Sequence, residues 1–92
     1  MRIEWSARAV LDLKAISEHL EQDRNQETAN RVTRTIYDAV QSLRTMPRRG
    51  REGRVDSTRE LVVQRLPCIV VYGLVGERIL ILNIVHGAQR WP

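Results

Sequence analysis

The sequence is poor in several residue types, and each scarcity excludes a class of protein. It has no Phe and only two Trp and two Tyr among 92 residues, so its core must be built from aliphatic side chains. Cys68 is the single cysteine, which excludes an internal disulfide and is typical of a reducing compartment. No apolar run reaches the roughly 18 residues of a membrane span, and residues 1–5 do not resemble a signal peptide. We therefore expect a soluble, cytoplasmic protein with no membrane association.

Lysine is almost absent as well, although the chain is basic. The formal net charge is +4, and Lys14 is the only lysine among 15 basic residues. The basic excess lies in segment 44–65, where seven Arg stand against three acidic residues, whereas the rest of the chain balances. Arg presents a planar fork that matches carboxylate and phosphate groups. A GC-rich genome would also raise the Arg content, but it would not cluster the residues.

Two amphipathic helices are expected after a short strand at the start of the chain. Ile3 and Trp5 alternate with charged neighbours, which predicts the strand. Ser6 is a good N-cap for a first helix over 7–22. The predicted apolar stripes are Val10, Leu13, Ile16 and Leu20 in the first helix and Ala29, Val32, Ile36, Val40 and Leu43 in the second. The short break between the helices predicts an antiparallel helical hairpin.

Three further strands complete the expected fold. Asp23 or Asn25 can cap the second helix, and Pro47 ends it near Met46. Segment 48–58 has many charges, two Gly and no periodicity, which predicts a mobile loop. Strand-like runs follow at 61–65, 68–75 and 79–85. The sequence thus predicts a single α+β domain of order βααβββ over all 92 residues, with a helical hairpin packed on a largely antiparallel four-stranded sheet.

The Arg-rich loop is the first candidate site. Several Arg on a backbone made flexible by Gly can bind successive phosphates of a nucleic acid. This predicts target binding by Arg48, Arg49, Arg51 and Arg54. An acidic protein partner and a merely solvated turn are the alternatives, which electrostatics does not separate. The run 50–53 matches the GxxG pattern of KH domains, but the KH loop joins two helices, whereas this one joins a helix to a strand. We therefore discard the KH interpretation.

A second candidate site lies where the last strand ends. His86 and Arg90 follow that strand, and Arg59 and Arg65 lie on a neighbouring one. A ribonuclease could use the imidazole as acid or base and the guanidinium groups to stabilise the charge on the phosphate. The alternative role for His86 is a structural hydrogen bond.

The remaining candidates carry less chemistry. Trp91 either closes the edge of the core or anchors a partner. Metal-ligand spacing is absent among His19, Cys68 and His86, and no metal or other cofactor is expected.

Several stretches together resemble the RelE/ParE superfamily of bacterial toxins. They are Trp5-Ser6 with Ala9 and Asp12-Leu13, Leu43 to Pro47, Arg59-Glu60-Leu61, Val70-Val71-Tyr72, and Val85-His86-Gly87-Ala88 with the final Arg-Trp-Pro. The match follows the order of the expected elements over nearly the whole chain. This resemblance implies the toxin of a type II toxin–antitoxin system, held inactive by a cognate antitoxin protein.

The superfamily contains two kinds of toxin. RelE-like members are ribosome-dependent mRNA endonucleases, and ParE-like members inhibit DNA gyrase. Where RelE-like enzymes carry a phosphate-binding Arg in a strand, this chain has Ile69, and the basic aromatic tail of those enzymes is cut short at Pro92.

The resemblance therefore favours a ParE-like gyrase inhibitor with no catalytic residues. Its expected target-binding residues are Arg48, Arg49, Arg51, Arg54, Arg59, Arg65, His86, Arg90 and Trp91. The alternative is a nuclease acting on ribosome-bound mRNA, with His86, Arg65 and Arg90 as its catalytic residues. A binding module without toxicity is a third interpretation.

Overall fold

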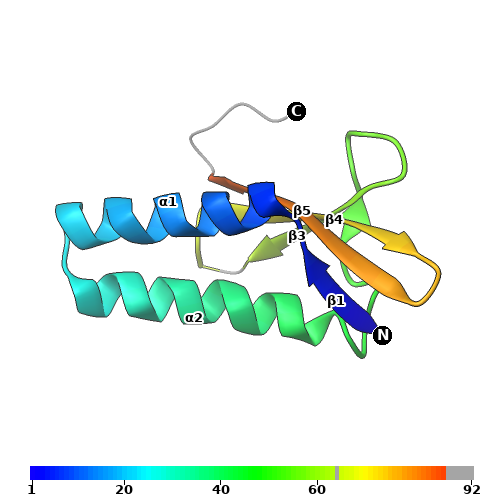
Figure 1. Ribbon diagram of the computed structural model, residues 1–92, viewed down its shortest axis with the longest axis horizontal. Helices are drawn as coiled ribbons and strands as arrows, with labels where there is room; N and C mark the ends of the chain where they lie inside the picture. Colours follow the sequence, from blue (N-terminus) through cyan, green and yellow to red (C-terminus); the bar gives the residue numbers. More distant parts are fainter. Residues whose placement is uncertain (64, 87–92) are drawn as a thin grey trace.

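A computed structural model describes residues 1–63 and 65–86. The elements are β1 (Arg2–Trp5), α1 (Ala7–Asp23), α2 (Gln26–Ser42), β2 (Arg51–Glu52), β3 (Arg59–Val63), β4 (Cys68–Val75) and β5 (Arg78–His86). The strands form one sheet of order β1-β5-β4-β3-β2, and the two helices form a hairpin against it (Figure 1). The expected α+β class and its order of elements are confirmed.

The sheet is mixed and has one strand more than expected. β1 pairs with β5 in parallel, because the helical hairpin carries the chain back before the sheet continues, and the other pairs are antiparallel. The fifth strand, β2, lies inside the segment expected to be a loop. Its two residues pair with Glu60 and Arg59 of β3. A strand of two residues is too short to show a periodic pattern, so sequence alone could not reveal it.

Both helices begin where their capping residues predict. The Ser6 hydroxyl accepts a hydrogen bond from the backbone N–H of Ala9, and the Asn25 side chain accepts one from Thr28. α2 ends at Ser42, earlier than the expected end near Met46, and a turn separates it from the proline.

The core lies between the helical hairpin and one face of the sheet. The stripe predicted for α2 is fully confirmed, since all five of its residues are buried. In α1 the prediction is wrong at one position, because Val10 is 51% exposed and Ala9 is completely buried instead. Leu13, Ile16 and Leu20 pack partly against the core as expected. Residues 9, 13, 16 and 20 also recur at helical spacing, so periodicity alone could not choose between the two stripes.

A bulge in β5 fixes how α1 sits on the sheet. The register between β4 and β5 shifts at Leu82, which disturbs the ladder of backbone hydrogen bonds. Two side chains from the beginning of α1 form hydrogen bonds with backbone groups of β5 at this bulge. The Ser6 hydroxyl donates to the carbonyl of Leu82 at 2.9 Å, and an Asp12 carboxylate oxygen accepts from the N–H of Ile84 at 2.9 Å. The Trp5-Ser6, Ala9 and Asp12 stretch is thus a structural signature of helix-to-sheet docking.

Two turns connect the last three strands of the sheet. β4 and β5 are joined through Gly76, whose φ of +58° is a conformation that glycine adopts without strain. β3 and β4 are joined by a turn that contains Arg65, which was expected to belong to the strand. No helix in the described part of the chain is both long and apolar enough to cross a membrane.

Candidate functional site: the two ends of the sheet

Three side chains of the sheet hold the basic segment, here residues 47–54, in place. The Tyr72 hydroxyl donates to the carbonyl of Pro47 at 2.8 Å and accepts from the N–H of Gly50 at 2.9 Å. The Arg59 guanidinium donates to the carbonyl of Gly50 at 2.6 Å and reaches that of Arg48 at 3.3 Å. The expectation of a mobile loop is therefore wrong for this segment, because buried groups tie its backbone to β3 and β4.

Glu60 is the third anchor and the one buried charged residue among the described positions. Its side chain is completely buried, and its carboxylate accepts from the Arg51 guanidinium at 3.0 Å and from the backbone N–H of Arg54 at 3.0 Å. A carboxylate removed from water needs such partners, because its desolvation is otherwise strongly unfavourable. The Arg59-Glu60-Leu61 stretch that carries part of the family resemblance therefore has a structural role.

Gly50 of the segment has a packing role as well. A Cβ added to Gly50 would lie 2.7 Å from the Tyr72 hydroxyl oxygen and 3.0 Å from the carbonyl of Glu60. Only a residue without a side chain allows the backbone to approach the tyrosine this closely. The first glycine of the GxxG pattern is thus explained by contact with the sheet.

These contacts divide the predicted arginines of the segment and of β3 into two groups. Arg51 and Arg59 hold the segment in place and so have a structural role. The Arg48, Arg49 and Arg54 side chains lie on exposed residues, although Arg49 also donates to the Ser42 hydroxyl at 2.6 Å. Exposed guanidinium groups on an anchored backbone are available to a partner at a smaller cost in conformational entropy than groups on a mobile loop.

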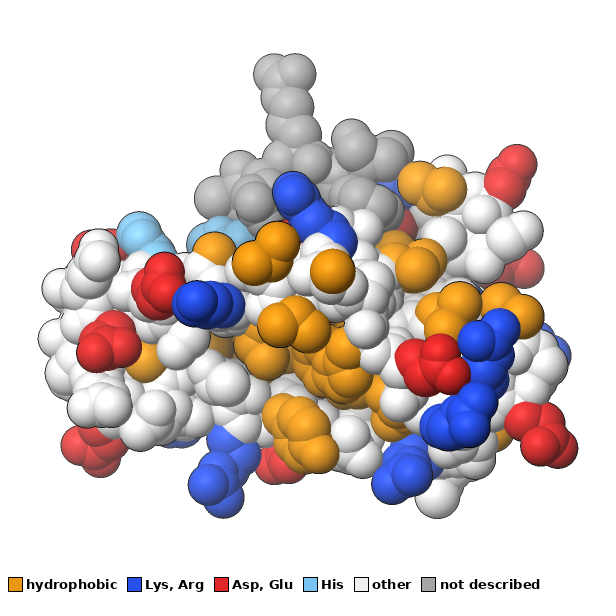
Figure 2. Space-filling view, in the orientation of Figure 1, with side chains coloured by type: hydrophobic (Ala, Val, Ile, Leu, Met, Phe, Trp, Pro, Cys, Tyr) orange, Lys and Arg blue, Asp and Glu red, His pale blue; other side chains and the backbone are white. Residues whose placement is uncertain are grey.

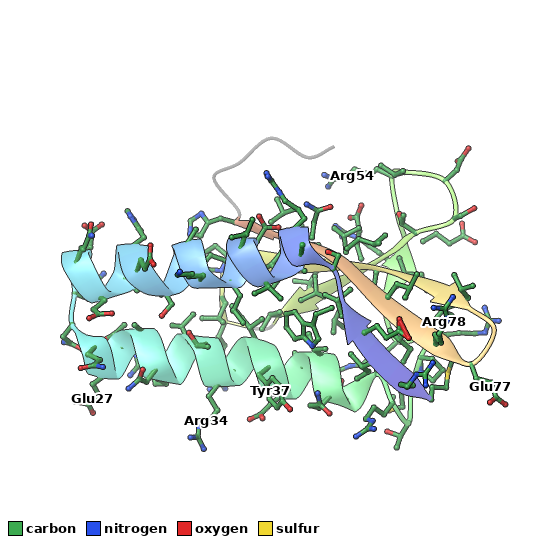
Figure 3. The ribbon with its side chains drawn as sticks, in the orientation of Figure 1. Glu27, Arg34, Tyr37, Arg54, Glu77 and Arg78 are labelled. Carbon is green, nitrogen blue, oxygen red and sulfur yellow. The ribbon has the colours of Figure 1, made fainter. Side chains whose placement is uncertain are left out.

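Arginines from distant parts of the sequence join this end of the molecule. Arg2 and Arg78 face each other as partners in the parallel β1–β5 pair, and both contact the Glu4 carboxylate, at 3.4 and 3.3 Å. Arg44 follows α2 and reaches the carbonyl of Met1. Figure 3 shows Arg78 and Glu77 near the tip of the β4–β5 hairpin, and Figure 2 shows basic side chains gathered at that end. Arg2 and Arg78 could not be predicted from the sequence, because only the parallel pairing brings them here.

His86 lies at the opposite end of the sheet, beside an apolar groove. The groove has a volume of about 480 Å³ and runs between α1, α2 and the turn after β3. Most of its lining is apolar: Ala15, Ile16, Leu20, Val32, Leu66, Pro67, Cys68 and Ile84, with Asp12, His19 and His86 as the polar members. Burial raises the pKa of the Cys68 thiol, which keeps it neutral. A groove of this composition suits apolar side chains better than phosphates.

The histidines and the cysteine share this groove without forming a metal site. Among residues 1–63 and 65–86, no group of three or more His, Cys, Asp or Glu could hold a metal ion. Arg90 and Trp91, the other residues predicted near His86, lie outside the described residues.

The register of the sheet separates Arg59 from His86. Arg59 is in line with Tyr72 and Ile81, whereas His86 is in line with Cys68 and Val63. The two rows are four residues apart along β3, which corresponds to about 13 Å at roughly 3.3 Å per residue. The grouping of Arg59 with His86 in one nuclease site is therefore wrong. Arg65, an exposed residue of the turn after β3, lies at the same end as His86.

The position that would hold a phosphate-binding Arg in a RelE-like enzyme lies in an aliphatic row. Ile69 pairs with Val62 on one side and with Val85 on the other. These residues alternate with the core residues Leu61, Val63, Cys68, Val70 and Ile84, so they lie on the sheet face that the helices do not cover. This row carries no group that could bind a phosphate.

Comparisons with known proteins agree on one family. Residues 3–91 match the family model described as the ParE toxin of type II toxin-antitoxin system, parDE. The chain is 40% identical over 91 residues to "Putative toxin Y4kP" of Sinorhizobium fredii. The aligned residues cover 99% of this chain and 93% of that protein. Among solved structures, one from the chromosomal ParDE TA system of P. aeruginosa superposes with a TM-score of 0.88 at 28% identity, covering 94% of this chain and 95% of that one. The chain therefore belongs to the ParE family of type II toxin–antitoxin toxins.

Proposed function

We propose that this toxin acts by binding and inhibiting DNA gyrase and that it does not cleave RNA. The observation that carries the proposal is the aliphatic row at Ile69, which has no group to bind a phosphate, together with the distance of Arg59 from His86 along the sheet. His86 adjoins an apolar groove, Arg59 lies about 13 Å along the sheet at roughly 3.3 Å per residue, and Ile69 stands where a RelE-like enzyme has an Arg. Phosphodiester cleavage requires proton transfer and charge stabilisation at one phosphate. A protein that binds its target requires only a shaped and charged surface.

The anchored basic segment is our candidate for part of the target-binding surface. Arg48, Arg49 and Arg54 are exposed basic residues of this segment, and the ion pair with Glu60 holds Arg51 against β3. Arg59 contributes indirectly, because its guanidinium holds the backbone of Gly50 in place. Arg65 and His86 lie at the other end of the sheet, so we assign them no role in the same contact.

We further propose that a cognate antitoxin binds this chain through an acidic and partly apolar segment. Two features support this partner. The chain carries a formal net charge of +4, and the groove beside α1 exposes an aliphatic lining. Segments of antitoxin type that fold on binding bury such grooves with residues at helical spacing.

Purified protein tests the proposed function directly. We expect it to block supercoiling of relaxed plasmid by gyrase and to leave ribosome-bound mRNA intact. The co-purified antitoxin should restore supercoiling when added in equal amount. Normal supercoiling in the presence of excess toxin, together with cleavage of mRNA in the ribosomal A site, would assign the chain to the RelE-like alternative.

The substitution His86→Ala separates the two functions further. A binder should lose toxicity only modestly, because the change removes contacts and not a proton-transfer step. We expect growth inhibition in cells to persist, with gyrase inhibition within about threefold of the wild type, since single peripheral contacts are worth less than about 1 kcal/mol. His19→Ala, which changes the other histidine of the same groove, is the matched control. Complete loss of toxicity in His86→Ala alone would contradict the proposal.

A further inference from the structure

We infer that the gyrase-binding surface extends beyond the basic segment onto the end of the molecule formed by β1, the β4–β5 hairpin and the end of α2. We call this the hairpin-end patch and define it as Met1, Arg2, Arg44, Met46 and Arg78. The inference rests on the proposed function, because it names the surface through which the target is bound. The partner that fits the patch is an acidic protein surface with apolar residues at its centre.

The charges of the patch are not balanced within this chain. Arg2 and Arg78 lie directly opposite each other in the β1–β5 pair, an arrangement that is unfavourable for like charges. A single carboxylate, Glu4, is shared between them, at 3.4 and 3.3 Å. The Arg44 guanidinium adds a third positive charge nearby and approaches the carbonyl of Met1 at 3.5 Å. Carboxylates of a partner would reduce this repulsion, which is electrostatic complementarity of the kind found across interfaces.

The apolar residues of the patch indicate a protein partner. Met1 is 41% exposed and Met46 is 57% exposed, and both adjoin Arg44, the first through its carbonyl and the second two residues along the chain. Met and Arg are enriched at protein interfaces, whereas Lys is depleted. A DNA backbone would satisfy the guanidinium groups but would leave the two methionines in water. The combination therefore favours an acidic protein over DNA.

The patch is continuous with the anchored basic segment. Arg49 donates its backbone N–H to the carbonyl of Met46, and its side chain reaches the Ser42 hydroxyl at the end of α2. The basic surface therefore runs from the β4–β5 hairpin past the end of α2 to the segment that Tyr72 and Glu60 hold. Figure 2 shows blue side chains with red ones beside them at this end of the molecule.

The test compares two triple variants with the same change in charge. Arg2→Gln/Arg44→Gln/Arg78→Gln removes the charges of the patch. Arg24→Gln/Arg31→Gln/Arg34→Gln removes three from exposed positions of the helical hairpin, where Figure 3 shows Arg34 projecting from α2. Binding to purified gyrase without DNA is measured by biolayer interferometry, and inhibition of supercoiling is measured in parallel. We expect the Kd of the patch variant to rise about tenfold, with the control within about twofold of the wild type.

A second pair of variants covers the case in which the triple variant loses its fold. Met46→Gln leaves every ion pair intact, and Leu11→Gln changes an equally exposed apolar residue on α1. We expect Met46→Gln alone to weaken gyrase binding, by about threefold or more. Thermal denaturation and antitoxin binding should match the wild type for both.

The outcomes separate this inference from the proposed function. Equal gyrase binding by the wild type and by both patch variants would overturn the inference while leaving gyrase as the target. Equal loss in the patch and control triple variants would overturn it too, because net charge alone would then explain the effect. If the patch variant lost affinity for a short DNA duplex and kept its affinity for gyrase, the partner would be nucleic acid and the inference would be wrong. Wild-type protein that neither binds nor inhibits gyrase would overturn the proposed function itself and the inference with it.

Discussion

Tyr72 connects the core to the surface that we propose binds the target. Its ring is completely buried among the aliphatic core residues, and its hydroxyl bridges two backbone groups of the basic segment. The chain has few aromatic residues, and this one is the only aromatic side chain in the core cluster of the described residues. Together with Arg59 and Glu60, this side chain holds the segment containing Arg48 and Arg49 against the sheet.

We predict that Tyr72→Phe lowers the free energy of unfolding by about 1–3 kcal/mol. The ring still fills the core, but the N–H of Gly50 loses its buried acceptor and the carbonyl of Pro47 loses its donor. Urea denaturation followed by circular dichroism measures the change. Tyr37→Phe removes a hydroxyl from a tyrosine that is 49% exposed and should change stability by less than about 0.5 kcal/mol. Equal stabilities of the two variants would contradict the anchoring role of Tyr72.

At the scale of elements, the bulge of β5 couples the first helix to the sheet. The Asp12 carboxylate accepts from the N–H of Ile84, approaches the Asn83 amide at 3.4 Å and pairs with Arg8 at 3.3 Å. The contact spans residues that are far apart in the sequence, so it joins the start of the fold to its last strand. α1 also forms one wall of the apolar groove, and its docking therefore determines the width of that groove.

We predict that Asp12→Ala destabilises the protein by about 1–3 kcal/mol, because the backbone N–H of Ile84 loses its acceptor. Native-state hydrogen exchange should show faster exchange at Ile84 in particular. Glu18→Ala, which changes an exposed acidic residue of the same helix, should leave both quantities close to those of the wild type. Unchanged exchange at Ile84 in the Asp12 variant would exclude the proposed coupling.

At the scale of the whole molecule, the basic and the apolar surfaces lie at opposite ends of the sheet. The β4–β5 hairpin, the end of α2 and the anchored segment form the basic end, whereas the groove beside α1 lies near His86. Two binding events can therefore use different surfaces. We infer that target binding depends on charge and that antitoxin binding depends more on apolar contact.

We predict that Arg48→Gln/Arg49→Gln weakens gyrase binding and flattens its dependence on salt without lowering the melting temperature. Both side chains are exposed, and screening by salt acts on exposed charges. Binding is measured at several ionic strengths, and melting is measured by calorimetry. Arg51→Gln should behave differently and lower stability, because it removes a charged partner of the buried Glu60 carboxylate. Identical salt dependence in the wild type and the double variant would leave the solvated-turn interpretation of these two residues.

The sequence alone determined the features that depend on local physics. The caps at Ser6 and Asn25, the buried stripe of α2 and the apolar β4 and β5 strands all follow from interactions between residues close in the chain. The combination of short stretches also identified the superfamily.

Only the tertiary structure decided what depends on contacts between distant residues. β2 exists because β3 offers it a partner, and Ala9 is chosen over Val10 because the first helix docks closely on the sheet. The sequence does not show which arginines of segment 44–65 are structural, because the answer depends on the Glu60 carboxylate and the Tyr72 hydroxyl of neighbouring strands. The pairing of the strands also separates Arg59 from His86 and places Arg2 beside Arg78. Strand pairing sets these distances, and a pairing register is not encoded by any single stretch of the chain.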